Sequence, residues 1–302
     1  MKSGDLVVRK SYGGDITFRI EGIYNDMSLL KGVDYRLIAD APLEDLVSAS
    51  DTTVRRRTRQ AQIKMIQSVE ALELDRRRQK EKRPMEDVFQ GTQNGSVNPQ
   101  VSYFEVPGKV LHLDGDPNYL QKSMALYRQL RVPAEGHYIQ ESSMAEAVYR
   151  LLPQTRPDIV VITGHDGVLK HIKHRDLYSL QSYKNSQNFV NAVKNARQYE
   201  KHLDMLTVIA GACQSHFEAL IGAGANFASS PGRIMIHALD PVYVAAKASY
   251  TSIRDTVNIA DIAPHTMTGT EGLGGVETRG SFRVGMPKWK DLSTLQVTPS
   301  IV

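Results

Sequence analysis

With 302 residues, 41% of them hydrophobic, the chain is long enough for one large domain or two smaller ones in an ordinary globular protein. Its single cysteine excludes an intramolecular disulfide framework and any zinc site that needs two or more cysteines, and the lack of any run of about 18 apolar residues predicts no membrane span. The formal charge of +4 is an uneven average, because residues 52–85 carry +7 and the remainder −3. The basic character therefore belongs to one segment of the chain. Because the N-terminus lacks the long apolar core of a signal peptide, we expect a cytoplasmic protein.

The first fifty residues predict a small β module. The runs DLVVR (5–9), ITFRIEGI (16–23) and DYRLIAD (34–40) are read as strands, and a Gly-Gly pair within residues 11–15 supplies a turn. We therefore expect a small antiparallel sheet or barrel of the SH3-like kind over residues 1–50. Such modules usually bind a partner, which the sequence does not name.

Residues 51–100 predict a basic helix followed by a polar linker. Residues 52–83 contain no Pro or Gly and are rich in Arg, Gln, Lys, Glu and Leu, and Pro84 is expected to end the helix. Residues 89–100 are polar and contain the turn dipeptide Asn-Gly. The basic run has no aromatic residues, so we interpret it as a solvated helix face and expect no nucleic-acid partner. The apolar stripe of the helix is thin and includes Ile63, Ile66, Leu72 and Leu74.

Residues 101–302 alternate strand and helix patterns. Alternation at this spacing predicts right-handed βαβ units and a mostly parallel sheet. The central apolar runs do not alternate with polar residues, as expected for strands that helices cover on both faces. The expected fold class is therefore α/β, with a mostly parallel sheet flanked by helices. The expected strands are residues 108–114, 136–140, 158–164, 206–211 and 225–229, and the expected helices are residues 117–130, 142–152 and 188–203.

Two of the expected strands end in a chemically capable side chain. His165 follows DIVVITG, and Cys213 follows LTVIAG 48 residues later. Only one loop and one helix separate these strands, so we expect them to be neighbours in the sheet. Both side chains would then lie at the carboxyl edge, where open α/β sheets bind their ligands. Gly164, Gly167 and Gly211 would allow tight turns and a close approach of substrate.

This pairing favours nucleophilic catalysis. We expect a helix to begin at or just after Cys213, with Ser215 as a candidate cap, so that the helix dipole and a nearby imidazole favour the thiolate. A thiolate beside a histidine performs acyl transfer. The alternative is structural, because a lone cysteine after a strand is usually a small buried residue and a lone histidine can cap a loop. The histidines that lack this setting are His112, inside a strand, and His171, His174 and His202, in polar stretches.

These residues resemble those of a known clan of cysteine peptidases. Two apolar strands that end in His and Ala-Cys, in this order, resemble caspases, clostripain, gingipains and legumain, and the spacing is close to the roughly 50 residues typical of caspases. Over nearly its full length the chain resembles the sporulation-specific cysteine protease family YabG, in SGDLVVRKSYGGDITFRI, HLDGDPNYL, VVITGHDG and AGACQSHFEALIGAGANFASSP. One departure is that Asp166 stands between His165 and Gly167, where the clan usually has Gly directly after the histidine.

The resemblance implies a caspase-like cysteine peptidase domain over residues 101–302 that needs no cofactor or metal. It also implies work in the cytoplasm of the mother cell, in association with the forming spore coat, and cleavage of spore-coat and cortex-related proteins after Arg. His165 would polarise the scissile carbonyl or protonate the leaving amine. Cys213 would be the nucleophile and would give its backbone N–H to the oxyanion hole, with Asp166 or Gly167 supplying the second N–H.

Selection of Arg needs a buried carboxylate, because a guanidinium seeks a bidentate acceptor. Asp114 and Asp116 in HLDGDP follow the first strand of the sheet, on the same edge as His165, and Asp240 in HALDP follows a later strand. Each of them could instead form a turn or cap a helix. Asp114 is the first choice for the pocket.

Other functions fit parts of the sequence. A β module, an Arg-rich helix and an α/β domain could form a non-catalytic spore structural or nucleic-acid-binding scaffold. A flavodoxin-like regulatory domain is a further alternative, although a Gly-rich phosphate-binding loop is absent. A protease that selects Arg could also process itself within VRRRTRQ (54–60) or DRRRQKEKR (75–83) if the basic helix opens locally, the alternative being a plain solvated spacer.

Overall fold

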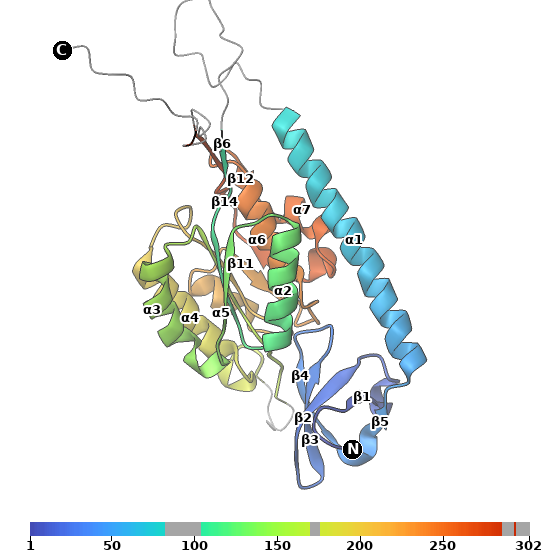
Figure 1. Cartoon of the computed structure of the whole chain (residues 1–302). Helices are drawn as coiled ribbons and strands as arrows, with labels where there is room; N and C mark the ends of the chain where they lie inside the picture. Colours follow the sequence, from blue (N-terminus) through green and yellow to red (C-terminus); the bar gives the residue numbers. More distant parts are fainter. Residues whose placement is uncertain (82–103, 170–175, 286–292, 294–302) are drawn as a thin grey trace, which may run out of the picture.

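The computed structural model describes residues 1–81, 104–169, 176–285 and 293 of the chain (Figure 1). The N-terminal part is a five-stranded antiparallel sheet of order β4-β3-β2-β1-β5. Its strands lie at one end of the molecule (Figure 1, blue), and we call residues 1–50 the N-terminal module. The strands are β1 Leu6–Arg9, β2 Phe18–Tyr24, β3 Met27–Gly32, β4 Ile38–Pro42 and β5 Leu46–Ser48.

The prediction for this module is confirmed in its antiparallel character and corrected in its strands. The expected strand over residues 34–40 is wrong for its first half, because β4 begins only at Ile38. Residues 27–32 form β3, which the sequence did not indicate. The physical reason is that the backbones of Asp34 and Arg36 form hydrogen bonds with the other part of the molecule, and the pairing with β3 begins only where the carbonyl oxygen of Leu37 accepts the N–H of Gly32. The SH3-like assignment stays a prediction.

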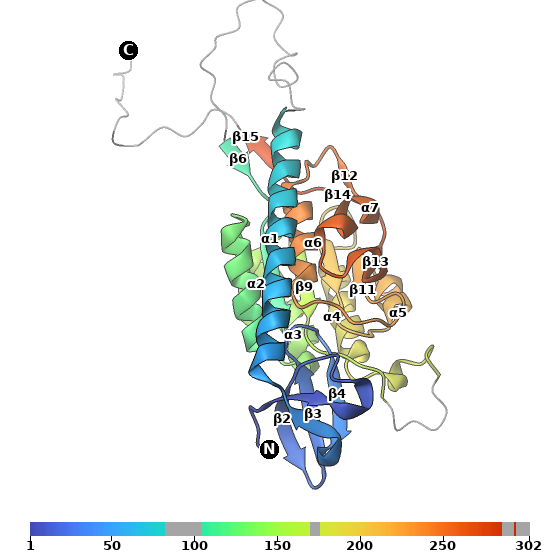
Figure 2. The same ribbon diagram turned by 90° about the vertical axis from the view of Figure 1, so that its right-hand side faces the viewer.

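A single long helix, α1 Asp51–Glu81, leaves the module and runs alongside α2 and α6 (Figures 1 and 2). The helix confirms the expectation for residues 52–83 as far as residue 81, while Pro84 and the polar linker at 89–100 lie outside the described residues. The predicted apolar stripe is largely wrong. Leu72 is buried together with Val69, whereas the remaining members of the predicted stripe are about half exposed: Ile63, Ile66 and Leu74.

The larger part is an α/β layer built on a six-stranded sheet of order β13-β11-β10-β9-β7-β8. All neighbouring strands are parallel except β13, which runs antiparallel to β11. The expected α/β class and the mostly parallel sheet are thus confirmed, and the caspase-like assignment stays a prediction. The strands are β7 Val110–Asp114, β8 Ala134–Tyr138, β9 Ile159–Thr163, β10 Thr207–Ala210, β11 Phe227–Ser229 and β13 Leu273–Gly275.

Helices cover both faces of this sheet. Every residue of β7, β9 and β10 is buried, which explains why these strands show no apolar–polar alternation in the sequence. One apolar cluster joins the sheet to α1, α2 and α6, and a second joins its other face to α3, α4 and α5. The helices are α2 Pro117–Gln129, α3 Met144–Thr155, α4 Ser186–Tyr199, α5 Phe217–Gly222, α6 Asp240–Tyr250 and α7 Ile259–Ile262.

Short two-stranded sheets complete the described structure. One pairs β12 Thr256–Val257 with β14 Thr278–Arg279, and the other pairs β6 Phe104–Val106 with β15 Arg283–Gly285. The second pair lies at the end of the molecule opposite the N-terminal module (Figure 2).

The N-terminal module packs on the carboxyl edge of the parallel sheet. A third apolar cluster contains residues of β1 to β5 together with Cys213 and Ile236 of the α/β layer. Two isolated bridges, Tyr35 with His237 and Leu37 with Asp166, join the backbones of the two parts. The module therefore lies over the edge at which the sequence predicts the active site.

Candidate active site

The carboxyl edge of the sheet carries the predicted side chains. The strand order reverses between β7 and β9, and in a sheet of this type the crevice at such a switch point is where ligands bind. Asp114 is the last residue of β7, His165 follows the end of β9 by two residues, and Cys213 follows the end of β10 by three. β9 and β10 pair in parallel, so the expectation that these two strands are neighbours is confirmed.

Cys213 is fully buried and holds a neutral thiol. Its Sγ accepts the backbone N–H of Ile236 at 3.0 Å, and the thiol donates to the carbonyl oxygen of the same residue at 3.4 Å. Burial raises the pKa of Cys213 to about 12. The thiolate that catalysis requires is therefore disfavoured while the sulfur is enclosed in this way.

The structure corrects the prediction that a helix begins at or just after Cys213. Helix α5 begins at Phe217, and the side chain of His216 caps it by accepting the N–H of Ala219. The Ser215 hydroxyl instead accepts the backbone N–H of Ala212 at 2.9 Å, which fixes a tight turn around the cysteine. The helix dipole consequently does not act on Cys213 as predicted, because its field is felt only within the first turn.

His165 is also fully buried, and neither ring nitrogen has a hydrogen-bond partner among the described residues. Its ring stacks on that of Tyr119 at a centroid distance of 5.2 Å, and its Nε2 lies 3.8 Å from Oδ2 of Asp116. Burial lowers the pKa of His165 to about 3, against the opposing attraction of Asp116. The imidazole is thus neutral, and its enclosure disfavours the uptake of a proton.

Two backbone N–H groups converge on one oxygen atom at this edge. The N–H of Cys213 and the N–H of Asp166 each donate to the carbonyl oxygen of Arg36, both at 3.2 Å. The N–H of Gly167 donates elsewhere, to Oδ1 of Asp166 at 2.9 Å. Of the two predicted candidates for the second N–H, only that of Asp166 shares an acceptor with Cys213.

The Asp166 carboxylate ties three segments of the edge together. Its Oδ1 accepts the backbone N–H of Asn185 at 2.7 Å, and its Oδ2 accepts the hydroxyls of Ser186 at 2.5 Å and Ser215 at 2.9 Å. Burial raises the pKa of Asp166 to about 6, although these hydrogen bonds oppose the shift. This one side chain therefore fixes the position of the loop after β9 relative to the turn after β10.

Asp114 binds an arginine. Nη1 of Arg36 lies 3.0 Å from Oδ1 and Nη2 lies 2.9 Å from Oδ2, a bidentate pair in which both side chains are fully buried. Burial alone would raise the pKa of Asp114, but the Arg36 guanidinium and His112 outweigh it and bring the pKa to about 2. The first choice for an arginine pocket therefore lies against an arginine of the chain itself.

The other two candidate carboxylates serve different elements. Asp116 caps α2, because its Oδ1 accepts the N–H groups of Asn118 at 2.8 Å and Tyr119 at 3.1 Å. Asp240 does not follow a strand, since it is the first residue of α6, and its Oδ1 accepts the N–H of Met267 at 2.7 Å. The predicted alternative of a helix cap thus describes Asp116, whereas Asp240 holds the backbone at Met267, a role that the sequence did not predict.

The sequence interpretation missed Arg36 and Tyr119. Arg36 lies in DYRLIAD, which was read as a strand, and no local pattern links it to Asp114, 78 residues away. Tyr119 was one aromatic residue of a predicted helix, yet its hydroxyl donates to the carbonyl oxygens of Gly32 and Tyr35, the latter at 2.9 Å. Of the remaining histidines, His112 is buried in β7 and His202 is exposed as expected, while His171 and His174 lie outside the described residues.

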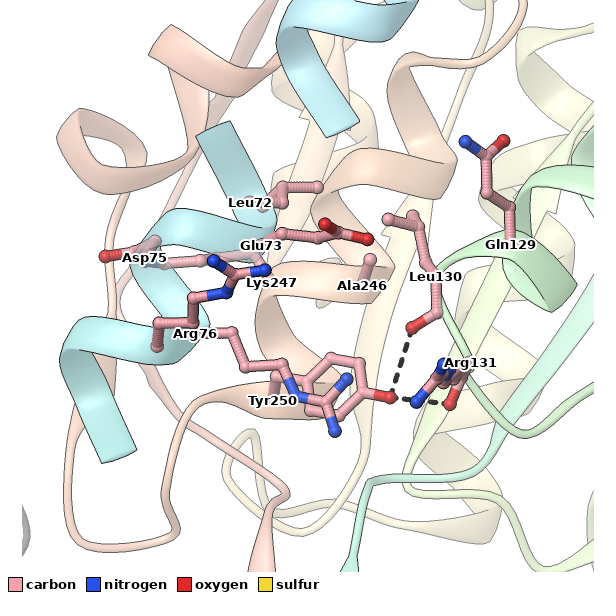
Figure 3. Close-up of a pocket in the computed structure, with 11 residues that line it drawn as sticks. Leu72, Glu73, Asp75, Arg76, Gln129, Leu130, Arg131, Ala246, Lys247 and Tyr250 are labelled. Atoms are coloured by element: carbon pink, nitrogen blue, oxygen red, sulfur yellow. Dashed lines mark hydrogen bonds and ion pairs between the residues drawn. The ribbon is translucent and has the colours of Figure 1, made fainter. Parts of the chain in front are cut away.

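Two cavities of the described part bear on the site and on the basic helix. One, of about 480 Å³, adjoins the site and is lined by Leu37, Ile38, Gly167 and Gln214 among others. The other, of about 340 Å³, lies between α1, α2 and α6, where the Arg76 guanidinium lies 4.0 Å over the Tyr250 ring (Figure 3). It is lined by the last residues of α2, at the opposite end of the sheet from the site, and is a structural contact of the basic helix.

No group of three or more His, Cys, Asp or Glu side chains suited to a metal ion occurs among the described residues. None of the helices described combines the length and the apolar character needed to cross a lipid bilayer.

Comparison with known sequences decides the family. The family described as YabG peptidase U57 matches residues 2–287. The chain belongs to this peptidase family. It is 45% identical over 289 residues to the sporulation-specific protease YabG of Bacillus subtilis (strain 168), a match that covers 94% of this chain and 97% of that protein. The chain is therefore a homologue of a sporulation protease, and its family consists of hydrolases that act on peptide bonds.

Among solved structures, the chain matches a LuxR-family two-component response regulator from Aurantimonas sp. SI85-9A1. The match has 16% identity, covers 40% of this chain and 71% of that one, and has a TM-score of 0.25. A similarity this low supports no statement about function.

Proposed function

We propose that the chain is a cysteine endopeptidase that cleaves proteins after arginine, with Cys213 as the nucleophile and His165 as the acid–base group. The observation that carries the proposal is the binding of Arg36. Its carbonyl oxygen accepts the N–H groups of Cys213 and Asp166, while its guanidinium is paired with Asp114. A substrate arginine bound in the same way would present its carbonyl to an oxyanion hole next to the cysteine.

The reaction follows from these groups. The Cys213 sulfur gives its proton to His165 and attacks the carbonyl carbon of the substrate arginine, and the resulting oxyanion accepts the N–H groups of Cys213 and Asp166. The peptide C–N bond then breaks, and His165 delivers the proton to the leaving amine. Water hydrolyses the thioester in a second addition and elimination, which restores the thiol and releases a carboxylic acid.

Selection of arginine rests on Asp114. A guanidinium has a planar fork of donors, and the two oxygens of one carboxylate match it with two parallel bonds. Arg36 makes this pair at 2.9 and 3.0 Å, and its Nε also donates to the carbonyl oxygen of Ala238 at 2.9 Å. A lysine ammonium cannot form all of these bonds at once, so we expect arginine to be preferred over lysine.

The biological setting belongs to the same proposal. We infer that the substrates are proteins of the spore coat and cortex machinery, cut in the mother cell at the forming coat, and that residues 101–302 form a caspase-like domain. The membership in a family with a sporulation protease supports the setting. The mostly parallel sheet, with His165 and Cys213 at its carboxyl edge, supports the fold.

The decisive test uses peptides that end in Arg, Lys, Asp or a neutral residue before a fluorogenic leaving group. Wild-type protein should cleave the Arg peptide, and Cys213→Ala should abolish cleavage while the far-UV circular dichroism stays unchanged, because Ala removes little volume. Cys213→Ser should be nearly inactive, since a hydroxyl lacks the low pKa of an activated thiol. A non-catalytic scaffold would cleave none of the peptides. Cleavage by Cys213→Ala at the wild-type rate would assign the reaction to another residue.

A further inference from the structure

We infer that residues 34–38 of the N-terminal module occupy the enzyme's own substrate cleft in the manner of a bound substrate, and that wild-type protein cleaves substrate only through the fraction of molecules in which they have withdrawn. The inference rests on the proposed function, because it identifies the edge of the sheet as a substrate cleft. It concerns a segment outside the catalytic residues and requires no cleavage of the chain.

The segment is held along its backbone on both sides. On one side, the N–H of Arg36 donates to the carbonyl oxygen of Ile236 at 3.1 Å, and the N–H of Ala238 donates to the carbonyl oxygen of Asp34 at 2.9 Å. On the other side, the N–H of Ile38 donates to the carbonyl oxygen of Asp166 at 3.1 Å. An extended chain bound through its main chain in this way is the usual mode of peptide recognition by strand addition.

The arginine of the segment fills the pocket completely. Its guanidinium donates to both oxygens of Asp114 and, through Nε and Nη2, to the carbonyl oxygen of Ala238 at 2.9 and 2.7 Å. Its Cζ lies 5.0 Å from the centre of the Tyr119 ring. With the Arg36 side chain fully buried, no second arginine can enter while the segment is in place.

The fit extends past Arg36. A Cβ atom on Gly167 would lie 2.6 Å from the carbonyl oxygen of Ile38, so a residue with a side chain at this position would push the segment away. Leu37 is buried, and its carbonyl oxygen accepts the N–H of Gly32 at 2.9 Å, which closes the loop that presents the segment. The cleft and the loop are thus shaped to each other.

The closed arrangement also explains why Cys213 and His165 are unreactive. Cys213 lies in one apolar cluster with Leu37 and Ile236, and its sulfur accepts a hydrogen bond from the backbone N–H of Ile236. The ring nitrogens of His165 have no hydrogen-bond partner among the described residues. Withdrawal of the segment would admit water, which lowers the cost of forming a thiolate and an imidazolium.

The single cysteine makes the test direct, because alkylation by iodoacetamide reports only on Cys213. In the full-length protein, Tyr119→Phe removes the hydroxyl that binds the carbonyl oxygens of Gly32 and Tyr35 but keeps the ring beside His165. Arg36→Gln removes the pocket's occupant. The matched control is Arg19→Gln, an arginine of β2 in the same module.

We expect alkylation of Cys213 to be at least about tenfold faster in Tyr119→Phe and in Arg36→Gln than in wild type, since each loses buried hydrogen bonds of the closed form only. Arg19→Gln should react at the wild-type rate. Hydrolysis of an Arg-ending peptide should rise in the same two variants. Thermal melting identifies any gain in alkylation that comes from unfolding, and Tyr119→Phe keeps the test valid if Arg36→Gln does not fold.

Two results would overturn the inference: a wild-type thiol that reacts as fast as the cysteine of an unstructured peptide, or rates in Tyr119→Phe and a folded Arg36→Gln that equal those of wild type. Faster alkylation without any peptide hydrolysis would support the covering segment and reject the proposed protease function. Hydrolysis at one rate in all variants would support the protease function and reject the covering segment.

Discussion

Replacing Asp114 by Asn tests the arginine pocket most sharply. The carboxylate forms two charge-assisted bonds, at 2.9 and 3.0 Å, with a fully buried guanidinium. Asn keeps one accepting oxygen, but its NH2 group faces a guanidinium N–H, so one bond is lost and two donors oppose each other. Loss of a buried hydrogen-bonded charge partner costs about 2–5 kcal/mol. This corresponds to a fall of about 30- to 5000-fold in kcat/KM for an arginine substrate.

The assay compares kcat/KM for paired peptides that differ only in having Arg or a neutral residue before the scissile bond. We expect Asp114→Asn to reduce the ratio of kcat/KM for the Arg peptide to kcat/KM for the neutral peptide by about 30- to 5000-fold, because the neutral peptide forms no bond with the carboxylate. Asp240→Asn is the matched control. It also removes one negative charge from a buried Asp, but its hydrogen bonds hold Met267 and Thr268 and not Arg36.

A parallel fall for both peptides in Asp114→Asn would refute the reasoning and make Asp114 a structural residue. The same fall in the ratio for Asp240→Asn would transfer the role to that carboxylate. Since Asp114→Asn also weakens the hold on Arg36, the ratio of the two peptides is the quantity to interpret, because opening of the cleft multiplies both rates equally.

Three further predictions concern the same site. His165→Ala should lower kcat far more than it raises KM in steady-state kinetics, because the imidazole acts on the transition state, while the exposed His202 can be replaced by Ala without loss. Burial holds the pKa of His165 at about 3, below its unfolded value of 6.5, so its contribution to stability is complete above pH 6.5 and is lost as the pH falls towards 3. Denaturant titrations should therefore find His165→Ala less sensitive to acid than wild type, and an equal dependence in both would contradict the assignment. Long incubation should produce new ends after arginines between Arg55 and Arg83 in wild type and not in Cys213→Ala, as measured by mass spectrometry; identical fragments from both proteins would exclude self-processing.

The sequence by itself determined the five parallel strands of the larger sheet and the edge that carries the candidate site, but not the antiparallel strand β13. Unbroken apolar runs such as 158–164 are a local signal of strands covered on both faces, and the structure buries all five residues of β9. Alternation of strand and helix then fixes parallel neighbours by chain connectivity alone. His165 and Cys213 could be assigned to one edge for that reason, without any knowledge of side-chain contacts.

Only the tertiary structure decided what those residues contact. The N–H of Asp166, and not that of Gly167, donates to the same oxygen atom as the N–H of Cys213. This choice depends on the turn after β9, where the Asp166 carboxylate accepts hydrogen bonds from Asn185 and Ser186. The pairing of Arg36 with Asp114 joins two parts of the chain 78 residues apart. Periodicity reports how one element is buried, whereas these contacts depend on how one folded part docks on another. The neutral thiol is also a tertiary effect, because burial raises the pKa of Cys213, and residues of the N-terminal module belong to the apolar cluster around the sulfur.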